Sequence, residues 1–270
     1  MKKIFYSALI LVLIVGASLF GAMAPIPVET ETRYADAPII STVANETIYF
    51  DTKDYTTVQS NGGVPQYVAV AGLNNACGAV AGSQIVAFYD KYYPNLIPGW
   101  DSYYTSNGNY RLQNSTYITP LMNELYELMR INVVADGVSE SEFKSGLQTY
   151  FTNHGYSASF QSVKSGSSLN FSACKTAISS NKVIVMFTQP GQVYDIDESA
   201  NSDTLYSYTI SGNHIMIAYG CVEVYYYNAS GGLFRTDNYL LVATGQANPK
   251  TAYYKVNSSN LEAAHIVNVG

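Results

Sequence analysis

The pattern of apolar and polar residues divides the chain into a helical first half and a strand-rich second half. The clearest helical segment starts at Cys77, where Ile85, Phe88 and Tyr92 recur at helical spacing before Pro94 closes the run. Small residues fill the first turns of this segment, so a second layer can approach it closely. We expect this helix to be central and buried.

Three further helices are predicted downstream. One covers residues 119–130, with Pro120 in its first turn. Another begins at the capping-box sequence 139–142 and stops at Gly155, where a residue with positive φ is common. The last is shorter and spans Phe171–Ser179.

Apolar and alternating runs predict strands over residues 183–188, 214–227, 239–244 and 253–256. Helices followed by strands favour an α+β layout. We therefore expect an N-terminal helical half, containing the Cys77 helix, to pack on a C-terminal antiparallel sheet.

Residues 1–24 have the pattern of an export signal. Lys2 and Lys3 precede an apolar run, and small residues follow it. Pro25 is an unfavourable residue after a cleavage site, and residues 4–24 approach the roughly 20 apolar residues that span a bilayer. We expect a secreted or extracellular-surface protein, with membrane attachment through residues 4–24 as the alternative.

Residues 25–63 are polar and Thr-rich, with several prolines near their start. They are interpreted as a linker or a short pro-segment. Residues 64–270 are then long enough for one catalytic domain with its own core.

The composition is 47% hydrophobic and only 13% charged, with 25 Tyr and a net charge of −6. Lys and Arg do not cluster beyond Lys2 and Lys3, which argues against nucleic-acid binding. Cys and His residues do not fall at metal-ligand spacing, so we predict neither a metal nor a cofactor.

Three cysteines allow at most one internal disulfide, so at least one thiol is left over. Cys77 is the candidate for a reactive thiol because it starts a helix, whose free N–H groups stabilise a thiolate. Gly78 would leave room for a substrate carbonyl to reach these N–H groups. Cys174 and Cys221 are expected to be core residues or a pair, with Cys221 on the strand face opposite His214.

His214 is the best candidate for the base that activates Cys77. It opens an apolar strand directly after a Ser-Gly-Asn loop, where a side chain can project into a cleft. His154 sits at a predicted helix end, which indicates ordinary capping, and His265 lies in the last few residues.

Two motifs carry a family resemblance: Asn74-Asn-Ala-Cys-Gly-Ala-Val-Ala-Gly and Gly212-Asn-His-Ile-Met-Ile-Ala-Tyr-Gly. Together they resemble the papain-like cysteine peptidases of the bacteriocin-processing type, over roughly residues 64–256. Ala79 stands where that family has Pro, and Tyr219 and Gly220 appear in reversed order. The resemblance implies a papain-like fold and an exported, thiol-dependent hydrolase of peptide or protein substrates, acting through a Cys77 acyl-enzyme.

The papain-like arrangement also implies an Asn or Asp that orients the histidine. If Asn228–Gly232 forms the hairpin turn, Gln246 lies opposite His214, whereas Asp237 lies near Glu223 and is too far away. Thr244 falls where the family carries its Asp, and Gln246 is the better hydrogen-bond acceptor. No carboxylate occupies this position, which favours the alternative of a weak or inactive site.

The resemblance further implies an oxyanion donor upstream of the cysteine, for which Asn75 and Gln66 are candidates. The alternative is that Asn74 and Asn75 cap the Cys77 helix. Two other functions stay open: a transglutaminase-like acyltransferase, which normally needs the missing carboxylate, and a non-catalytic surface or binding protein.

Overall fold

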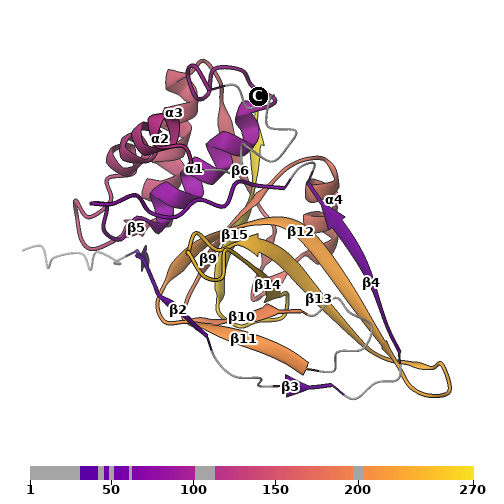
Figure 1. The fold of residues 1–270 in the computed structure, drawn as a ribbon. Coiled ribbons are helices and arrows are strands. Elements are labelled where there is room, and N and C mark those ends of the chain that lie inside the picture. Colours follow the sequence, from indigo (N-terminus) through magenta and orange to yellow (C-terminus); the bar gives the residue numbers. More distant parts are fainter. Residues whose placement is uncertain (1–30, 42–45, 49–51, 61–62, 101–112, 197–203) are drawn as a thin grey trace, which may run out of the picture. The chain divides into compact units, whose positions relative to one another are not determined.

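The computed structural model describes residues 31–41, 46–48, 52–60, 63–100, 113–196 and 204–270 (Figure 1). The predicted signal segment, residues 1–24, lies outside the described residues. Within the described ranges, no helix combines the length and the apolarity needed to cross a membrane.

An antiparallel sheet of eleven strands dominates the described ranges. Its order is β2-β11-β10-β14-β13-β12-β9-β15-β6, and β3 pairs with β11 while β4 pairs with β12. The strands of this sheet are β2 (Ile39–Ser41), β3 (Glu46–Thr47), β4 (Thr52–Gln59), β6 (Ala158–Ser162), β9 (Ile184–Thr188), β10 (Gly191–Asp195), β11 (Thr204–Ile210), β12 (His214–Tyr227), β13 (Leu233–Ala243), β14 (Thr251–Lys255) and β15 (Leu261–Val269). Two small pairs complete the strands: β1 (Arg33–Tyr34) with β5 (Val138–Ser139), and β7 (Lys164–Ser165) with β8 (Ser168–Leu169).

The prediction of a papain-like α+β fold is wrong, because the sheet outweighs the helices. Besides the predicted strands, the sheet takes up β2, β3 and β4 from residues 25–63, and β6, β10, β11 and β15. β3 and β4 are polar and β2 is very short, so none has the pattern of a buried strand; they join the sheet through backbone pairing along β11 and β12. The range interpreted as a linker or pro-segment therefore carries strands within its described part.

Four helices accompany the sheet in the described ranges: α1 (Cys77–Asp90), α2 (Ser115–Leu128), α3 (Glu140–Asn153) and α4 (Phe171–Ser179). The capping box at the start of α3 is confirmed, with Ser139 and Glu142 bonding each other's backbone N–H groups. The predicted start of α2 is wrong: Asn114 caps the helix, and Pro120 lies inside it. The Asn114 side chain accepts from the Thr116 N–H, so the helix begins one turn earlier than the proline indicates.

The β12–β13 hairpin controls where the candidate histidine lies. Its turn is the predicted one, since the Asn228 N–H donates to the Gly232 carbonyl at 3.0 Å. The predicted register holds at the histidine end, where Ile217 pairs with Ala243. A bulge between Ala218 and Gly220 shifts the pairs from Gly220 to Tyr226 by one residue.

The two faces of β12 pack against different helices. Ile215 and Ile217 belong to the apolar core shared with α1, whereas Met216 and Ala218 belong to the core shared with α4. In Figure 1, α1, α2 and α3 gather together and α4 lies beside β4 and β12. Because strand residues alternate between faces, β12 is buried on both sides at its start.

Candidate active site

Cys77 is the first residue of α1, and no side chain caps this helix. The N-cap residue is Ala76, which makes no side-chain hydrogen bond, so the alternative that Asn74 and Asn75 cap the helix is wrong. The N–H groups of Cys77 and Gly78 instead face the thiol and favour its anion.

Gly78 has a packing role that differs from the predicted one. A Cβ on Gly78 would lie 2.7 Å from Cγ1 of Val138, closer than atoms pack. The glycine therefore lets α1 approach β5, and the space beside it holds Val138 rather than open room for a carbonyl.

His214 opens β12 and is fully buried. Its Nε2 lies 2.7 Å from the carbonyl oxygen of Thr244. A carbonyl only accepts, so Nε2 carries the proton and donates it. Nδ1 is then an unprotonated acceptor, and it has no hydrogen-bond partner within the described ranges. This is the tautomer in which Nδ1 is free to receive a proton.

Thr244 holds the ring through its backbone and not through its side chain. The Thr244 hydroxyl bonds the carbonyls of Pro249 and Lys250 and accepts from the Gln246 N–H at 3.1 Å. β13 ends at Ala243, so the chain turns before Gln246 can pair with His214. The partner of the imidazole is thus a carbonyl, which the sequence could not distinguish from the Thr244 or Gln246 side chain.

Asp237 lies at the other end of the hairpin as predicted, opposite Val224, one residue from Glu223. The bulge in β12 causes this shift of one residue. The Asp237 carboxylate pairs with Arg235 at 2.6 Å and with Lys255 at 3.6 Å. It belongs to an ion-pair cluster and not to the histidine.

The thiol of Cys77 lies against the first residues of β12. The Ile215 N–H, which follows His214 directly, is among the groups that favour the Cys77 thiolate. The negative charge of Asp36 acts to raise the pKa of both Cys77 and His214. The fold thus brings the thiol to the backbone that follows His214, and no hydrogen bond joins it to Nδ1 within the described ranges.

An extended N-terminal segment, residues 31–38, crosses this place, and we call it the strap. Its Ala35 N–H donates to the Asn213 carbonyl at 3.3 Å, and the Asn213 amide donates to the Arg33 carbonyl at 2.9 Å. The Ala35 backbone also lies close enough to the His214 imidazole to favour its protonated form. Cys77 and His214 are 3% and 0% exposed, so the strap belongs to a site that is covered.

The covered state keeps both groups uncharged. Burial, followed by the negative charge of Asp36, raises the pKa of the Cys77 thiol well above its ordinary value. Burial lowers the pKa of His214, although the Thr244 carbonyl and Asp36 act in the opposite direction. At neutral pH the pair is therefore a thiol and a neutral imidazole, and the expected thiolate is absent from this arrangement.

Asn75 and Gln66 were the predicted oxyanion donors. Asn75 adopts a positive φ of 56°, and its amide donates to Oδ1 of Asn132 at 3.0 Å. Gln66 is half-buried in the extended segment before α1, where the neighbouring Tyr67 carbonyl accepts from Gln84 at 3.3 Å. Their role toward a substrate stays a prediction.

The remaining cysteines lie in the core on the α4 side. Cys174 and Cys221 are both free and buried in the same apolar cluster. The predicted orientation of Cys221 is wrong: the bulge turns it to the face of Met216, which by alternation is also the face of His214.

The other two histidines have structural surroundings. His154 is the C-cap residue of α3, and its Nδ1 lies 2.9 Å from the Tyr150 carbonyl. His265 bonds the carboxylate of Glu140 through Nε2 at 2.8 Å.

The strap and Asp36 were missed as parts of the site. Their backbone contacts with Asn213 and β5 are long-range and leave no periodicity in the sequence. The only sequence signal for the strap is the prolines near it, which favour an extended backbone.

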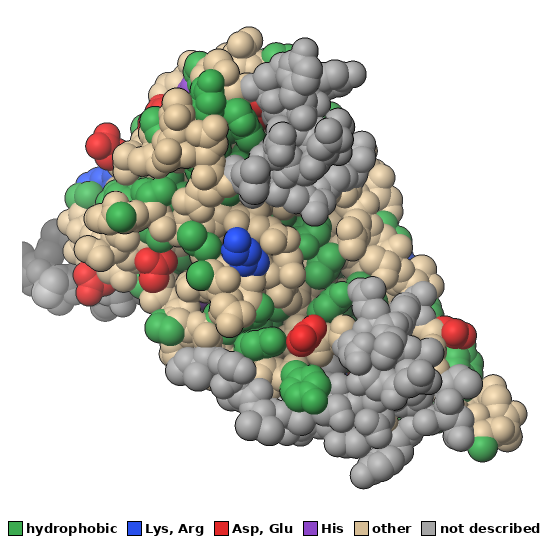
Figure 2. Space-filling model, viewed as in Figure 1, with side chains coloured by type: hydrophobic (Ala, Val, Ile, Leu, Met, Phe, Trp, Pro, Cys, Tyr) green, Lys and Arg blue, Asp and Glu red, His purple; other side chains and the backbone are tan. Residues whose placement is uncertain are grey.

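Charged side chains are few on the face of the molecule drawn in Figure 2. Figure 2 shows one face, on which Lys, Arg, Asp and Glu side chains are scattered among uncharged ones. In the ranges that the structure describes, no three His, Cys, Asp or Glu side chains gather as metal ligands would. No protein-family model, no curated protein and no solved structure matches this chain.

Proposed function

We propose that this protein is a thiol-dependent peptidase in which Cys77 is the nucleophile and His214 is the base, acting through Nδ1. The observation that carries the proposal is the tautomer of His214. Its Nε2–H is donated to the Thr244 carbonyl at 2.7 Å, which leaves Nδ1 as the acceptor nitrogen, and the Cys77 thiol at the start of α1 contacts the N–H of the next residue, Ile215.

The reaction follows from these groups. Nδ1 takes the thiol proton, and the Cys77 sulfur attacks the substrate carbonyl carbon to form a tetrahedral adduct. The C–N bond then breaks, the imidazolium gives its proton to the leaving amine, and a thioester remains on Cys77. Water, deprotonated by Nδ1, hydrolyses the thioester, releases the carboxylic acid and restores the thiol.

A backbone carbonyl can replace the usual Asn or Asp because the orienting group needs only to accept the Nε2 proton. A neutral carbonyl stabilises the imidazolium less than a carboxylate does. We therefore expect a slower enzyme than one with a full triad. The reaction also requires the strap to leave the site, since the covered thiol stays protonated.

The test uses the full chain with Arg33→Glu, which places a negative charge beside Glu142 and so loosens the strap. Hydrolysis of unfolded casein is measured in this background and after adding Cys77→Ser. We expect hydrolysis that depends on a reducing agent and falls at least ~100-fold in the Cys77→Ser protein.

Labelling by iodoacetamide gives a second readout, with Cys174 and Cys221 as buried references in the same chain. Cys77 should react faster than either in the loosened protein. Hydrolysis unaffected by Cys77→Ser would overturn the proposal. No hydrolysis at all would overturn it as well and favour the non-catalytic binding function.

A further inference from the structure

The strap is bonded along both of its edges. On one side, Arg33 pairs with Ser139 and Tyr34 pairs with Val138 in an antiparallel bridge to β5. On the other side, Asn213 bonds the strap backbone, as described above. An extended segment held by backbone bonds on both edges occupies a groove in the manner of a bound peptide.

The side chain of Tyr34 fills a buried pocket and is only 1% exposed. Its ring lies edge-on to Phe187, with centroids 5.1 Å apart. Burial and a hydrogen bond with the Glu262 carboxylate raise the pKa of the Tyr34 hydroxyl far above its ordinary value. The pocket thus takes an aromatic ring and provides an acceptor for a hydroxyl at its end.

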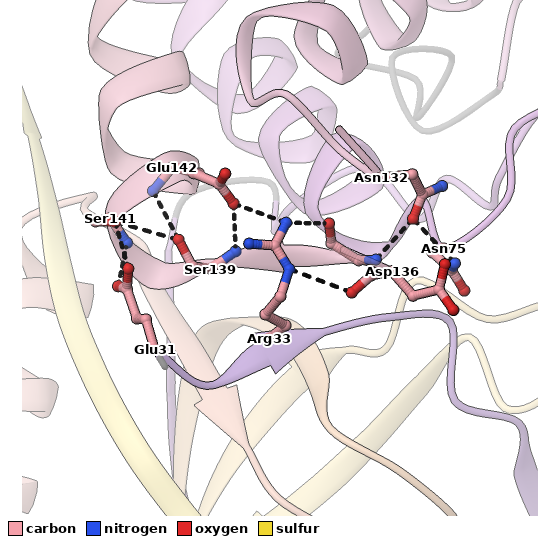
Figure 3. A network of polar contacts seen from close by, with 9 residues as sticks. Glu31, Arg33, Asn75, Asn132, Asp136, Ser139, Ser141 and Glu142 are labelled. Atoms are coloured by element: carbon pink, nitrogen blue, oxygen red, sulfur yellow. Dashed lines mark hydrogen bonds and ion pairs between the residues drawn. The ribbon is translucent and has the colours of Figure 1, made fainter. Parts of the chain in front are cut away.

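Arg33 occupies an adjoining site lined with acceptors. Its guanidinium pairs with Glu142 at 2.9 Å and donates to the carbonyls of Gly137 at 2.8 Å and Asp136 at 3.3 Å. Figure 3 shows these acceptors converging on Arg33 from the start of α3 and the loop before β5. Three oxygen acceptors around one position select a cation, and a planar guanidinium suits them best.

Gly137 allows the strap backbone to come this close. A Cβ at this position would lie 2.0 Å from the Tyr34 carbonyl oxygen, and Gly137 has a φ of +80°. Its N–H is held by Asn132 at 2.7 Å, and Asn132 is bonded in turn to Asn75 beside the Cys77 helix (Figure 3). The wall of the groove is thus tied to the start of α1.

We propose that the groove filled by the strap binds extended peptides in which a cationic residue and an aromatic residue precede a small residue lying at His214. Arg33, Tyr34 and Ala35 are the resident occupant of these three positions. The inference rests on the proposed function, because it names the substrate class of the same site. Asp36 follows at the position where its charge opposes a Cys77 thiolate, so the strap fills the groove without activating the nucleophile.

The test measures protection of Cys77 by peptides added in trans, which needs no catalysis. The protein is the full chain with Arg33→Glu, and the probe is the peptide Glu-Thr-Arg-Tyr-Ala-Asp-Ala-Pro, the sequence of residues 31–38. Control peptides carry Arg33→Glu or Tyr34→Ser. Iodoacetamide labelling of Cys77 is followed by mass spectrometry, with Lys175→Ala, which breaks an ion pair on α4, as the matched control protein.

We expect Cys77 in the Arg33→Glu protein to be labelled at least ~10-fold faster than in the unchanged chain or the Lys175→Ala protein. The strap peptide should restore most of the protection, and neither control peptide should do so. Equal protection by all three peptides, or protection by none, overturns the inference. An unchanged labelling rate in the Arg33→Glu protein overturns it as well.

These results separate the two proposals. Selective protection of Cys77 without casein hydrolysis supports peptide binding in the groove and rejects the peptidase function. Casein hydrolysis without selective protection supports the peptidase function and rejects the proposed peptide preference. Because Arg33→Glu could unfold the chain, Asn213→Ala serves as a second variant that removes one strap bond and leaves the side-chain pockets intact. Near-ultraviolet circular dichroism verifies that each protein is folded, and Asn213→Ala should also accelerate Cys77 labelling.

Discussion

Two buried histidines lie on the strands that flank β9 and have opposite surroundings. His214, on β12, bonds the Thr244 backbone carbonyl through Nε2, and the Nδ1 atoms of both histidines have no partner in the described ranges. His265, on β15, bonds the Glu140 carboxylate, which Lys144 also contacts. The Phe187 ring, on β9 between them, packs against His265 and also against the strap residue Tyr34.

A histidine–carboxylate pair is the usual sign of a catalytic base, yet here that pair joins α3 to β15. Glu140 opens α3, where a carboxylate also complements the helix dipole, and His265 joins this helix to the last strand. His214 has no carboxylate partner in the described ranges, but it lies next to the strap and precedes Ile215, whose N–H contacts Cys77. Under the proposed function, His214 acts as the base without an acid, and the His265–Glu140 pair has a structural role.

The largest effect expected is on hydrolysis by the Arg33→Glu protein after removal of either histidine. His214→Ala should lower kcat/KM by ~1000-fold, because a positioned general base contributes 10²–10⁴-fold. His265→Ala should change it by less than ~3-fold per folded molecule. Initial rates on a peptide substrate measure both, and equal losses would remove the distinction between the two regions.

The next effect concerns stability at the structural histidine. Glu140→Gln should lower the free energy of unfolding by about 1–2 kcal/mol near pH 7, allowing for solvent screening of this partly exposed group. Urea denaturation provides the measurement, and Cys77 labelling should stay unchanged. A loss of Cys77 protection in this variant would show that the two regions are coupled.

The same variant gives a pH dependence with a definite sign. The hydrogen bond from His265, together with Lys144, lowers the pKa of Glu140 from 4.5 to about 2. A carboxylate with a depressed pKa stabilises the fold above its unfolded pKa and loses this contribution as pH falls through the folded pKa. The stability difference between the two proteins should thus be complete above about pH 4.5 and vanish near pH 2. A difference that grows on acidification would contradict this assignment.

A smaller effect is expected from Thr244, a positioning residue that acts through its carbonyl. Thr244→Val removes the hydroxyl that bonds the Lys250 carbonyl at 3.3 Å, so the turn holding the carbonyl loosens. We expect kcat to fall ~10-fold, about 1.4 kcal/mol, with KM within ~2-fold. Thr244→Ser keeps the hydroxyl and should therefore have the kcat of the unchanged residue. If Thr244 had only a structural role, Thr244→Val would lower the fraction of folded protein and leave kcat and KM per folded molecule unchanged.

The smallest effect is expected at Gln246. The Gln246 backbone N–H bonds the Thr244 hydroxyl, and β13 ends before its side chain can pair with His214. Gln246→Ala should therefore change kcat/KM by less than ~2-fold in the Arg33→Glu protein. A ~10-fold loss would mean that the amide, and not the Thr244 carbonyl, orients the imidazole in the open form.

The sequence by itself determined the local features of this protein. Cys77 begins α1, His214 begins β12, Ser139 and Glu142 cap α3, and the hairpin turns at Asn228, because spacing and capping are set by residues within a few positions of one another. The register near His214 followed from the turn alone.

The tertiary structure alone decided the size of the sheet, the partner of the imidazole and the protonation state of the thiol. The polar strands near the N-terminus pair through backbone groups that every residue carries, so composition does not reveal them. The same holds for the Thr244 carbonyl at His214 and for the strap over Cys77. A helix N-terminus predicts a thiolate, but burial under a segment more than 30 residues away in sequence outweighs it, and only the folded chain brings that segment to the site.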